Sequence, residues 1–253
     1  MRYITTAVLL LIALGTGFAM PGITELLTAL DENYSMTADV SAKVDVTQQK
    51  TGQGTKKLEM MYYRRDCDKS FLIVMLNPSY EKGNGYLRIK DNFWMYRRNT
   101  RTFQHINRDE SIGGTNARGQ DFEGRKITEL FEGVKDKNGK ELISLDTLGK
   151  IPVYKFEVKA IVNDVDYPRK TYWVRQDSKL ALKEASYSNS GSLMQTTYYL
   201  KYTKVKDSFI PVRQMFIDEF EKGNKTVVEI SAINTDKLDN TIFTKAYLEN
   251  LSK

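Results

Sequence analysis

The stretch MTADVSAKVDVT, residues 36–47, decides the fold class of this chain. Apolar side chains occupy every second position of it, at Met36, Ala38, Val40, Ala42, Val44 and Val46. The positions between them carry polar or charged side chains, so the apolar pattern has a period of two. That period is typical of a β-strand that buries one face and leaves the other in water. We therefore expect a half-buried strand here, in a chain built mainly of β-sheet.

The strand pattern continues along the chain. Residues 51–54, TGQG, predict a turn, and residues 57–65 return as the partner strand of a hairpin. Further strands are expected at 86–90, 93–97, 141–148, 153–160, 170–175, 182–187, 196–202, 212–220 and 226–233. The composition agrees, because 15 Tyr and 11 Phe against 5 Pro in 253 residues favour β-sheet. With no linker or break in composition, we expect one domain over residues 20–253.

Two of the expected strands do not alternate. Residues 71–76 and 93–96 are apolar at every position, which predicts that both faces of these strands avoid water. An antiparallel sheet normally leaves one face in solvent. Something must therefore cover each side of these strands, and the candidates are helices, a bound apolar ligand or a partner protein.

Short helices and one long loop lie between the strands. Ile23, Leu26, Leu27 and Leu30 have the spacing of a helix with one apolar stripe, and residues 127–131 predict a second, shorter stripe. Residues 243–251 predict a small helix near the C-terminus. Residues 107–121 are polar and rich in glycine without an apolar period, so we expect a long mobile loop there.

The first nineteen residues have the features of an export signal. Arg2 is followed by an apolar run from Ala7 to Leu14 and by small residues at Gly17 and Ala19. The run is too short for the roughly 20 residues that a membrane-spanning helix needs. We expect a cleavable signal peptide over residues 1–19 and a periplasmic mature protein, and no cysteine follows the apolar run to accept a lipid.

The residue inventory argues against metal, redox and catalytic chemistry. One Cys and one His leave no disulfide framework, thiolate zinc site or site with two imidazoles, so we expect no cofactor. His105 lies on an expected strand with no Ser or Cys motif beside it, and we assign no catalytic residue. The net charge of +6 and basic pairs such as residues 64–65 and 97–98 favour a solvated or lipid-facing rim over nucleic-acid binding.

Several motifs in fixed order carry a family resemblance. These are GNGYLRI at 83–89, DNFWMY at 91–96, Gly113-Gly114, Asp121-Phe122 and FTKAYL at 243–248. Together they resemble the outer-membrane lipoprotein-sorting proteins of the LolA/LolB superfamily, over essentially the whole mature chain. The resemblance implies a mainly β (α+β) fold, an incomplete antiparallel β-barrel of about eleven strands. Short lid helices would cover an apolar cavity for acyl chains.

The resemblance also implies roles for individual residues. The residues expected in the lipid cavity are Phe71, Ile73, Met75, Leu87, Trp94, Tyr96 and Trp173. The residues expected in the lid are Ile23, Leu26, Leu27, Leu30, Ile127, Leu130 and Phe131. The family latches its lid with an arginine next to a proline, and the matching positions here are Arg65 or Arg64. Asp66 stands in place of that proline, so only a basic residue near the cavity rim is implied.

The function implied is that of a periplasmic carrier, which shields the acyl chains of a lipoprotein or another lipid during transport toward the outer membrane. Its partners would be an inner-membrane donor and an outer-membrane acceptor, and we expect a monomer. One alternative is an envelope sensor or adaptor that uses the same half-barrel and the 107–121 loop to contact a partner protein. Another is an envelope hydrolase, which would need a polar pocket holding His105 near a carboxylate.

Overall fold

The structure is a computed structural model that describes residues 20–115, 117–119 and 124–251. The expected signal peptide and the Asp121-Phe122 motif lie outside these residues. No helix within the described ranges has both the length and the apolar character needed to cross a membrane.

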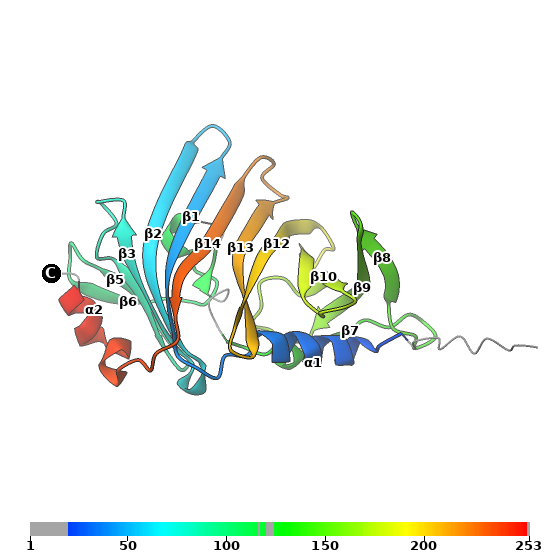
Figure 1. The fold of residues 1–253 in the computed structure, drawn as a ribbon. Coiled ribbons are helices and arrows are strands. Elements are labelled where there is room, and N and C mark those ends of the chain that lie inside the picture. Colours follow the sequence, from blue (N-terminus) through cyan, green and yellow to red (C-terminus); the bar gives the residue numbers. More distant parts are fainter. Residues whose placement is uncertain (1–19, 116, 120–123, 252–253) are drawn as a thin grey trace, which may run out of the picture.

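In these described ranges, fourteen antiparallel strands form one curved, open sheet (Figure 1). The first six are β1 (Val40–Lys50), β2 (Gly54–Arg65), β3 (Ser70–Asn77), β4 (Gly85–Ile89), β5 (Asn92–Arg97) and β6 (Thr102–His105). The others are β7 (Phe131–Gly133), β8 (Ile143–Leu148), β9 (Ile151–Ala160), β10 (Arg169–Arg175), β11 (Ala181–Tyr187), β12 (Leu193–Val205), β13 (Ser208–Asp218) and β14 (Lys225–Asn234). The spatial order is β6-β5-β4-β3-β2-β1-β14-β13-β12-β11-β10-β9-β7, with β8 also paired to β9.

The predicted fold class is confirmed, with more strands than the resemblance implied. The sheet does not close, because β6 and β7 lie at opposite ends of the order and do not pair with each other. β6 has four residues and β7 has three. A piece as short as β7 spans too few positions for an apolar period to mark it in the sequence, whereas the strand expected at His105 is β6.

Helices and 3-10 turns cover parts of this sheet. The helices are α1 (Ile23–Tyr34) and α2 (Lys245–Leu251), and the turns are η1 (Asp66–Asp68), η2 (Ile112–Gly114), η4 (Ile127–Glu129) and η5 (Asn240–Phe243). In Figure 1, α1 lies along the half of the sheet that contains β7 to β13, and α2 lies at the opposite end, beside β3 to β6. The second helical stripe expected at 127–131 is a single 3-10 turn that runs directly into β7.

Cross-strand pairing defines which residues share a face of the sheet. One row of directly paired residues runs through Phe156, Tyr172, Glu184, Thr197, Phe216, Thr226, Gln48 and Lys56, from β9 to β2. Residues opposite each other in a ladder point to the same side. We call this side the inner face, and α1 packs against it.

Strands β3 to β5 are covered on both sides, as their continuous apolar runs predict. Their inner face packs in a cluster with Ile112, from the loop after β6. Their outer face packs against Phe243 of η5 and Leu248 of α2. A Cβ atom at Gly85 would lie 2.5 Å from the Leu248 side chain, so only glycine lets α2 approach β4 this closely. Residues 238–251, which we call the C-terminal segment, are therefore part of the core.

Candidate functional site

The inner face carries two apolar clusters, and each has its own cover. The first is formed by β9 and β10 and is covered by α1, whose stripe of Ile23, Leu26, Leu27 and Leu30 is buried on it. Phe131 is buried in the same cluster, and Ile127 and Leu130 pack against its edge. All seven residues expected in the lid are thus brought together in one cluster. Six of them lie on α1 and at η4 and cover Phe156, Val158, Tyr172 and Val174, whereas Phe131 belongs to β7 of the sheet itself.

Polar contacts near both ends of α1 hold this layer in place, and they include the Asn33 side-chain amide, which donates to the Ser178 and Lys179 carbonyls. The Asp31 carboxylate accepts hydrogen bonds from the backbone N–H groups of Ile127 at 2.5 Å and Thr128 at 3.0 Å. The Ile23 N–H donates to Glu141 Oε2 at 2.8 Å. At the other end of α1, the hydroxyls of Tyr34 and Tyr202 lie 2.8 Å apart. Asp31 therefore ties the helix to η4, so that the two elements form one unit.

A buried ion pair lies on the inner face between the two clusters. Lys170 Nζ is 2.7 Å from Glu184 Oε1, and the Ser186 hydroxyl donates to the same oxygen at 3.0 Å. Burial by itself raises the pKa of Glu184, but the Lys170 charge and these hydrogen bonds outweigh it and hold the pKa below its ordinary value. The middle of the inner face is therefore polar and charged.

The second apolar cluster is formed by β1 to β5 and is covered by a loop. Its walls include Val46, Leu58, Met60, Phe71, Ile73, Met75, Tyr86 and Phe93. The cover, which we call the strap, is residues 107–115 and 117–119. Ile112 and Ala117 of the strap are each only 1% exposed and pack into this cluster. The Gly113 N–H donates to the Tyr86 hydroxyl at 2.9 Å, and Lys56 Nζ donates to the Gly113 carbonyl at 2.8 Å.

The far side of the strap is tied to the connection between β9 and β10. Arg108 lies 2.5 Å from Asp164, and Arg118 lies 2.8 Å from Asp166. Arg125 also reaches Asp164, at 3.1 Å. The strap thus spans the inner face from the first half of the sheet to the second. The loop expected to be mobile is, in its described part, docked on the sheet.

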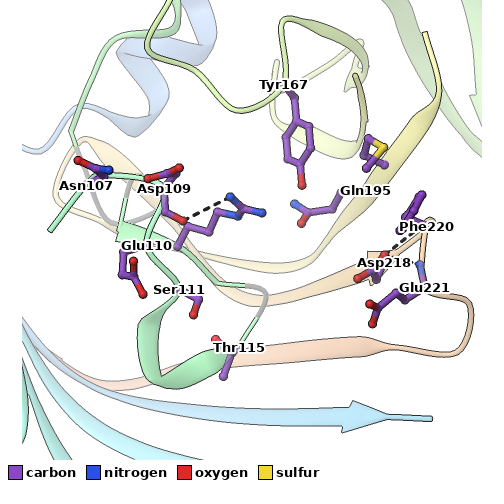
Figure 2. Close-up of a pocket in the computed structure, with 12 residues that line it drawn as sticks. Asn107, Asp109, Glu110, Ser111, Thr115, Tyr167, Gln195, Asp218, Phe220 and Glu221 are labelled. Atoms are coloured by element: carbon purple, nitrogen blue, oxygen red, sulfur yellow. Dashed lines mark hydrogen bonds between the residues drawn. The ribbon is translucent and has the colours of Figure 1, made fainter. Parts of the chain in front are cut away.

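A pocket of about 460 Å³ opens beside the strap (Figure 2). Its walls are Asn107, Asp109, Glu110, Ser111, Thr115, Arg118, Tyr167, Met194, Gln195, Asp218, Phe220 and Glu221. Four of these residues carry carboxylates, and Tyr167 and Phe220 add aromatic rings. This pocket is polar. In the described part of the chain, the two apolar clusters are packed against the strap and α1 and do not line this open volume.

The seven residues expected in the lipid cavity lie on two faces. Phe71, Ile73 and Met75 are buried together on the inner face, under the strap. Leu87, Trp94 and Tyr96 are on the outer face, with the C-terminal segment. Trp173 also faces outward, where the ammonium groups of Lys155 and Lys183 lie 5.4 and 4.4 Å from its ring. Only the first three therefore share a surface with the strap. The prediction mixed two faces because strands that are apolar at every position give no sign of which face is inner.

The two latch candidates hold different segments. Arg65 pairs with Asp39 at 2.9 Å, and it donates to Asn240 Oδ1 at 2.7 Å and to the Leu238 carbonyl. It therefore fixes the C-terminal segment. Arg64 pairs with Asp66 at 2.5 Å, and the other oxygen of Asp66 accepts from the Met36 N–H at 3.4 Å. Both arginines are thus linked to the segment between α1 and β1, Arg64 through Asp66 and Met36, and Arg65 through Asp39.

His105 lies apart from the pocket. It is exposed on the edge strand β6, where its ring stands edge-on to Trp94 at 5.9 Å on the outer face. It does not line the pocket beside the strap. Among the described residues, no group of three or more His, Cys, Asp or Glu side chains could hold a metal ion. The condition set for the hydrolase alternative, a pocket holding His105, is not met there.

Sequence reasoning missed several residues of this face. Ile112, Ala117 and Tyr86 were not predicted to take part, although all three are buried in the second cluster. One signal was present: Ile112 is an apolar side chain in a polar, glycine-rich stretch, directly before Gly113-Gly114. An apolar residue at the tip of such a loop indicates a docking point.

Comparison with solved structures defines the class of fold. A LolA superfamily protein from Nitrosomonas europaea superposes with a TM-score of 0.74 at 18% identity, over 90% of this chain and 100% of the other. An outer membrane lipoprotein-sorting protein domain from Vibrio parahaemolyticus gives 0.76 at 16% identity, over 90% and 98%. A DUF1329 family protein from Desulfovibrio piger gives 0.76 at 18% identity, over 89% and 97%. The chain therefore has the LolA-like fold, as its motifs predict.

Sequence comparison gives the family. Residues 67–250 match a protein-family model described as "Uncharacterized protein", and the chain belongs to that family. A search of curated protein sequences finds no match. These three solved structures are 16–18% identical to this chain, so their likeness is one of fold.

Proposed function

We propose that this protein is a periplasmic carrier that binds the acyl chains of a lipid or lipoprotein against the inner face of its sheet. The observation that carries the proposal is the pair of apolar clusters on that face, each covered by a separate short element instead of a second sheet. Residues of the proposed site under the strap are Phe71, Ile73, Met75, Leu58, Met60 and Phe93, and those under the lid are Phe156, Val158, Tyr172 and Val174. The names of the Vibrio and Nitrosomonas proteins, a lipoprotein-sorting domain and a LolA superfamily protein, agree with this function.

The energetics suit a carrier that must also release its cargo. Each methylene removed from water contributes about 0.8 kcal/mol, so one long acyl chain could gain roughly 10 kcal/mol before ordering costs. Part of this gain is lost, because the chain must replace contacts that the covers already make with the walls. The net affinity is then moderate, which permits transfer to an acceptor.

The lid formed by α1 and η4 is suited to opening. α1 has 12 residues and buries a single stripe, and a helix of that length is only marginally stable without its packing surface. Its polar ties, through Ile23, Asp31, Asn33 and Tyr34, lie in the first and last turns of α1. We propose that the lid can lift as a unit while the sheet keeps its shape.

The cellular setting follows from the same proposal. The expected signal peptide would deliver the chain to the periplasm, where a carrier would receive lipid from an inner-membrane protein and pass it to an outer-membrane acceptor. Basic side chains at the ends of β2 and β5, including Arg97 and Arg98, would favour contact with anionic headgroups. We propose that the carrier works as a monomer.

Native mass spectrometry of the protein purified from its own envelope tests the proposal. We expect adducts with the mass of a lipid or acylated peptide, and saturable uptake of a fluorescent long-chain fatty acid by the delipidated protein. A folded protein that carries no lipid and takes up no fatty acid would rule out the carrier function.

A further inference from the structure

The strap lies where the proposed acyl site would be. It covers the walls that contain Phe71, Ile73 and Met75, and its own Ile112 is packed among them. The fit is close: a Cβ atom at Gly113 would lie 2.5 Å from Leu58 Cδ1 and 3.4 Å from Met75 Cε. Gly113 also has φ +61°, a conformation that favours glycine. The tip of the strap is thus fitted to the apolar wall as a bound ligand would be.

The contacts that hold the strap are few and mostly polar. Apart from Ile112 and Ala117, its ties to the sheet include the two hydrogen bonds at Gly113. The ion pairs of Arg108 and Arg118 join it to the β9–β10 connection, and both arginines are partly exposed. Asp164 is half exposed, so its pair with Arg108 contributes little to stability, because water solvates the separated charges well. The Arg118–Asp166 pair is the more buried of the two. The only β-pairing of the strap is an isolated bridge within it, between Ser111 and Arg118.

We propose that the strap is a built-in competitor for the acyl site, which occupies the apolar wall of β1 to β5 in the empty protein and is displaced when lipid binds. This inference rests on the proposed carrier function and concerns its regulation. The strap would keep the apolar wall out of water between rounds of transport. It would also lower the apparent affinity for lipid, since only the fraction of molecules with the strap undocked can bind.

If the strap competes with lipid, weakening its docking raises the affinity for lipid. If the strap only supports the site, weakening its docking lowers that affinity or leaves it unchanged. Ile112→Ser weakens the docking of the strap and leaves every wall residue in place. We expect the apparent affinity for a fluorescent long-chain fatty acid to rise about tenfold, because the undocked fraction increases. Leu145→Ser is the matched control, since Leu145 is an apolar side chain that is 61% exposed on β8. It should leave the affinity unchanged.

A second pair of variants displaces the strap by steric conflict. Gly113→Val would collide with Leu58, whereas Gly139→Val places the same side chain at a similar positive φ, +79°, in open space. We expect a higher affinity for the fatty acid with Gly113→Val and no change with Gly139→Val. Unchanged or lower affinity in both strap variants, with wild-type binding intact, would overturn the competitor role and leave the carrier function standing.

Hydrogen–deuterium exchange on the unmodified protein gives an independent answer. Ligands usually protect the segments that they contact. A displaced strap would do the reverse, so we expect amides of residues 108–115 to exchange faster when the fatty acid is bound, while those of β1 and β2 exchange more slowly. Slower or unchanged exchange in 108–115 would refute displacement. Failure of every form of the protein to bind the fatty acid would refute the carrier function and the competitor role together.

Discussion

At the scale of single residues, Arg65 shows how a side chain implied as a latch can serve another element. Its guanidinium is 8% exposed and forms hydrogen bonds with Asp39, Asn240 and the Leu238 carbonyl. The Phe243 ring lies 4.9 Å from it. These partners belong to the connection between α1 and β1 and to the C-terminal segment, so Arg65 closes the outer side of the fold. Its planar fork of donors suits it to join several acceptors at once.

The Arg65–Asp39 pair predicts a pH-dependent stability. Hydrogen bonds from Arg65 hold the pKa of Asp39 below its ordinary value of 3.8. A lowered carboxyl pKa stabilises the folded state above the ordinary value, and this contribution disappears as the pH falls through the lowered one. Asp39→Asn should therefore cost about 3 kcal/mol of unfolding free energy at neutral pH, because the buried Arg65 loses its short ion pair and is left with the longer one to Asp68, at 3.8 Å. Urea unfolding at neutral pH and at low pH measures this cost, which should shrink as acid removes the wild-type charge.

An exposed ion pair provides the control for this prediction. Glu229 lies 3.4 Å from Arg213, and both side chains are more than half exposed. Glu229→Gln should change the unfolding free energy by less than about 0.5 kcal/mol. A cost for Asp39→Asn that is equally small at neutral pH would show that the buried pair does not hold the C-terminal segment.

At the scale of elements, the lid is a helix and a 3-10 turn joined by one carboxylate. Asp31 accepts from two backbone N–H groups at the start of η4 and from the Thr128 hydroxyl at 2.6 Å. Asp31 thus satisfies the first N–H groups of η4 as a helix cap does, although it lies 96 residues away from Ile127 in the sequence. No local sequence motif could reveal it, because capping rules consider only neighbouring residues.

Asp31→Ala should loosen the lid without unfolding the sheet. Loss of a capping carboxylate typically costs about 1 kcal/mol, so we expect faster amide exchange in residues 127–131 and faster release of bound fatty acid. Glu32→Ala is the control, because Glu32 is an exposed neighbour in the same helix. Equal release rates for the two variants would show that the α1–η4 link does not control opening.

At the scale of the whole molecule, the sequence predicts the sheet well and its inner face poorly. Strands such as β1 alternate clearly, and so does the α1 stripe, because each element has one face in contact with solvent. Strand β3 is buried on six successive residues, and nothing local distinguishes its two sides. That is why Leu87, Trp94 and Tyr96 were grouped with Phe71, although pairing places them on the opposite face.

The elements that cover the sheet explain the remaining differences between the predicted and the observed structure. The strap contributes Ile112 to the cluster on β1 to β5, and the C-terminal segment contributes Phe243 and Leu248 to the opposite side. The strap docks through two apolar side chains in an otherwise polar stretch, which is too few to form a pattern. The C-terminal helix is predicted by its sequence, but the face of the sheet that it covers is not. Long-range docking of this kind is fixed by the tertiary structure, and the sequence shows only that some cover must exist.

Two neighbouring residues on β5 permit the most direct test of the central claim, that acyl chains bind the inner face. Trp94 points to the outer face, and Met95 packs on the inner cluster. The chain has only two tryptophans, so Trp173→Phe leaves Trp94 as the sole reporter. Adding Trp94→Phe and Met95→Trp moves that reporter to the inner face.

Quenching of these two single-tryptophan forms by a brominated long-chain fatty acid is the deciding measurement. Bromine quenches tryptophan only at short range, so we predict strong, saturable quenching of the Met95→Trp form and little quenching of the Trp94 form. Quenching of Trp94 with none at position 95 would place the lipid on the outer face and contradict the account.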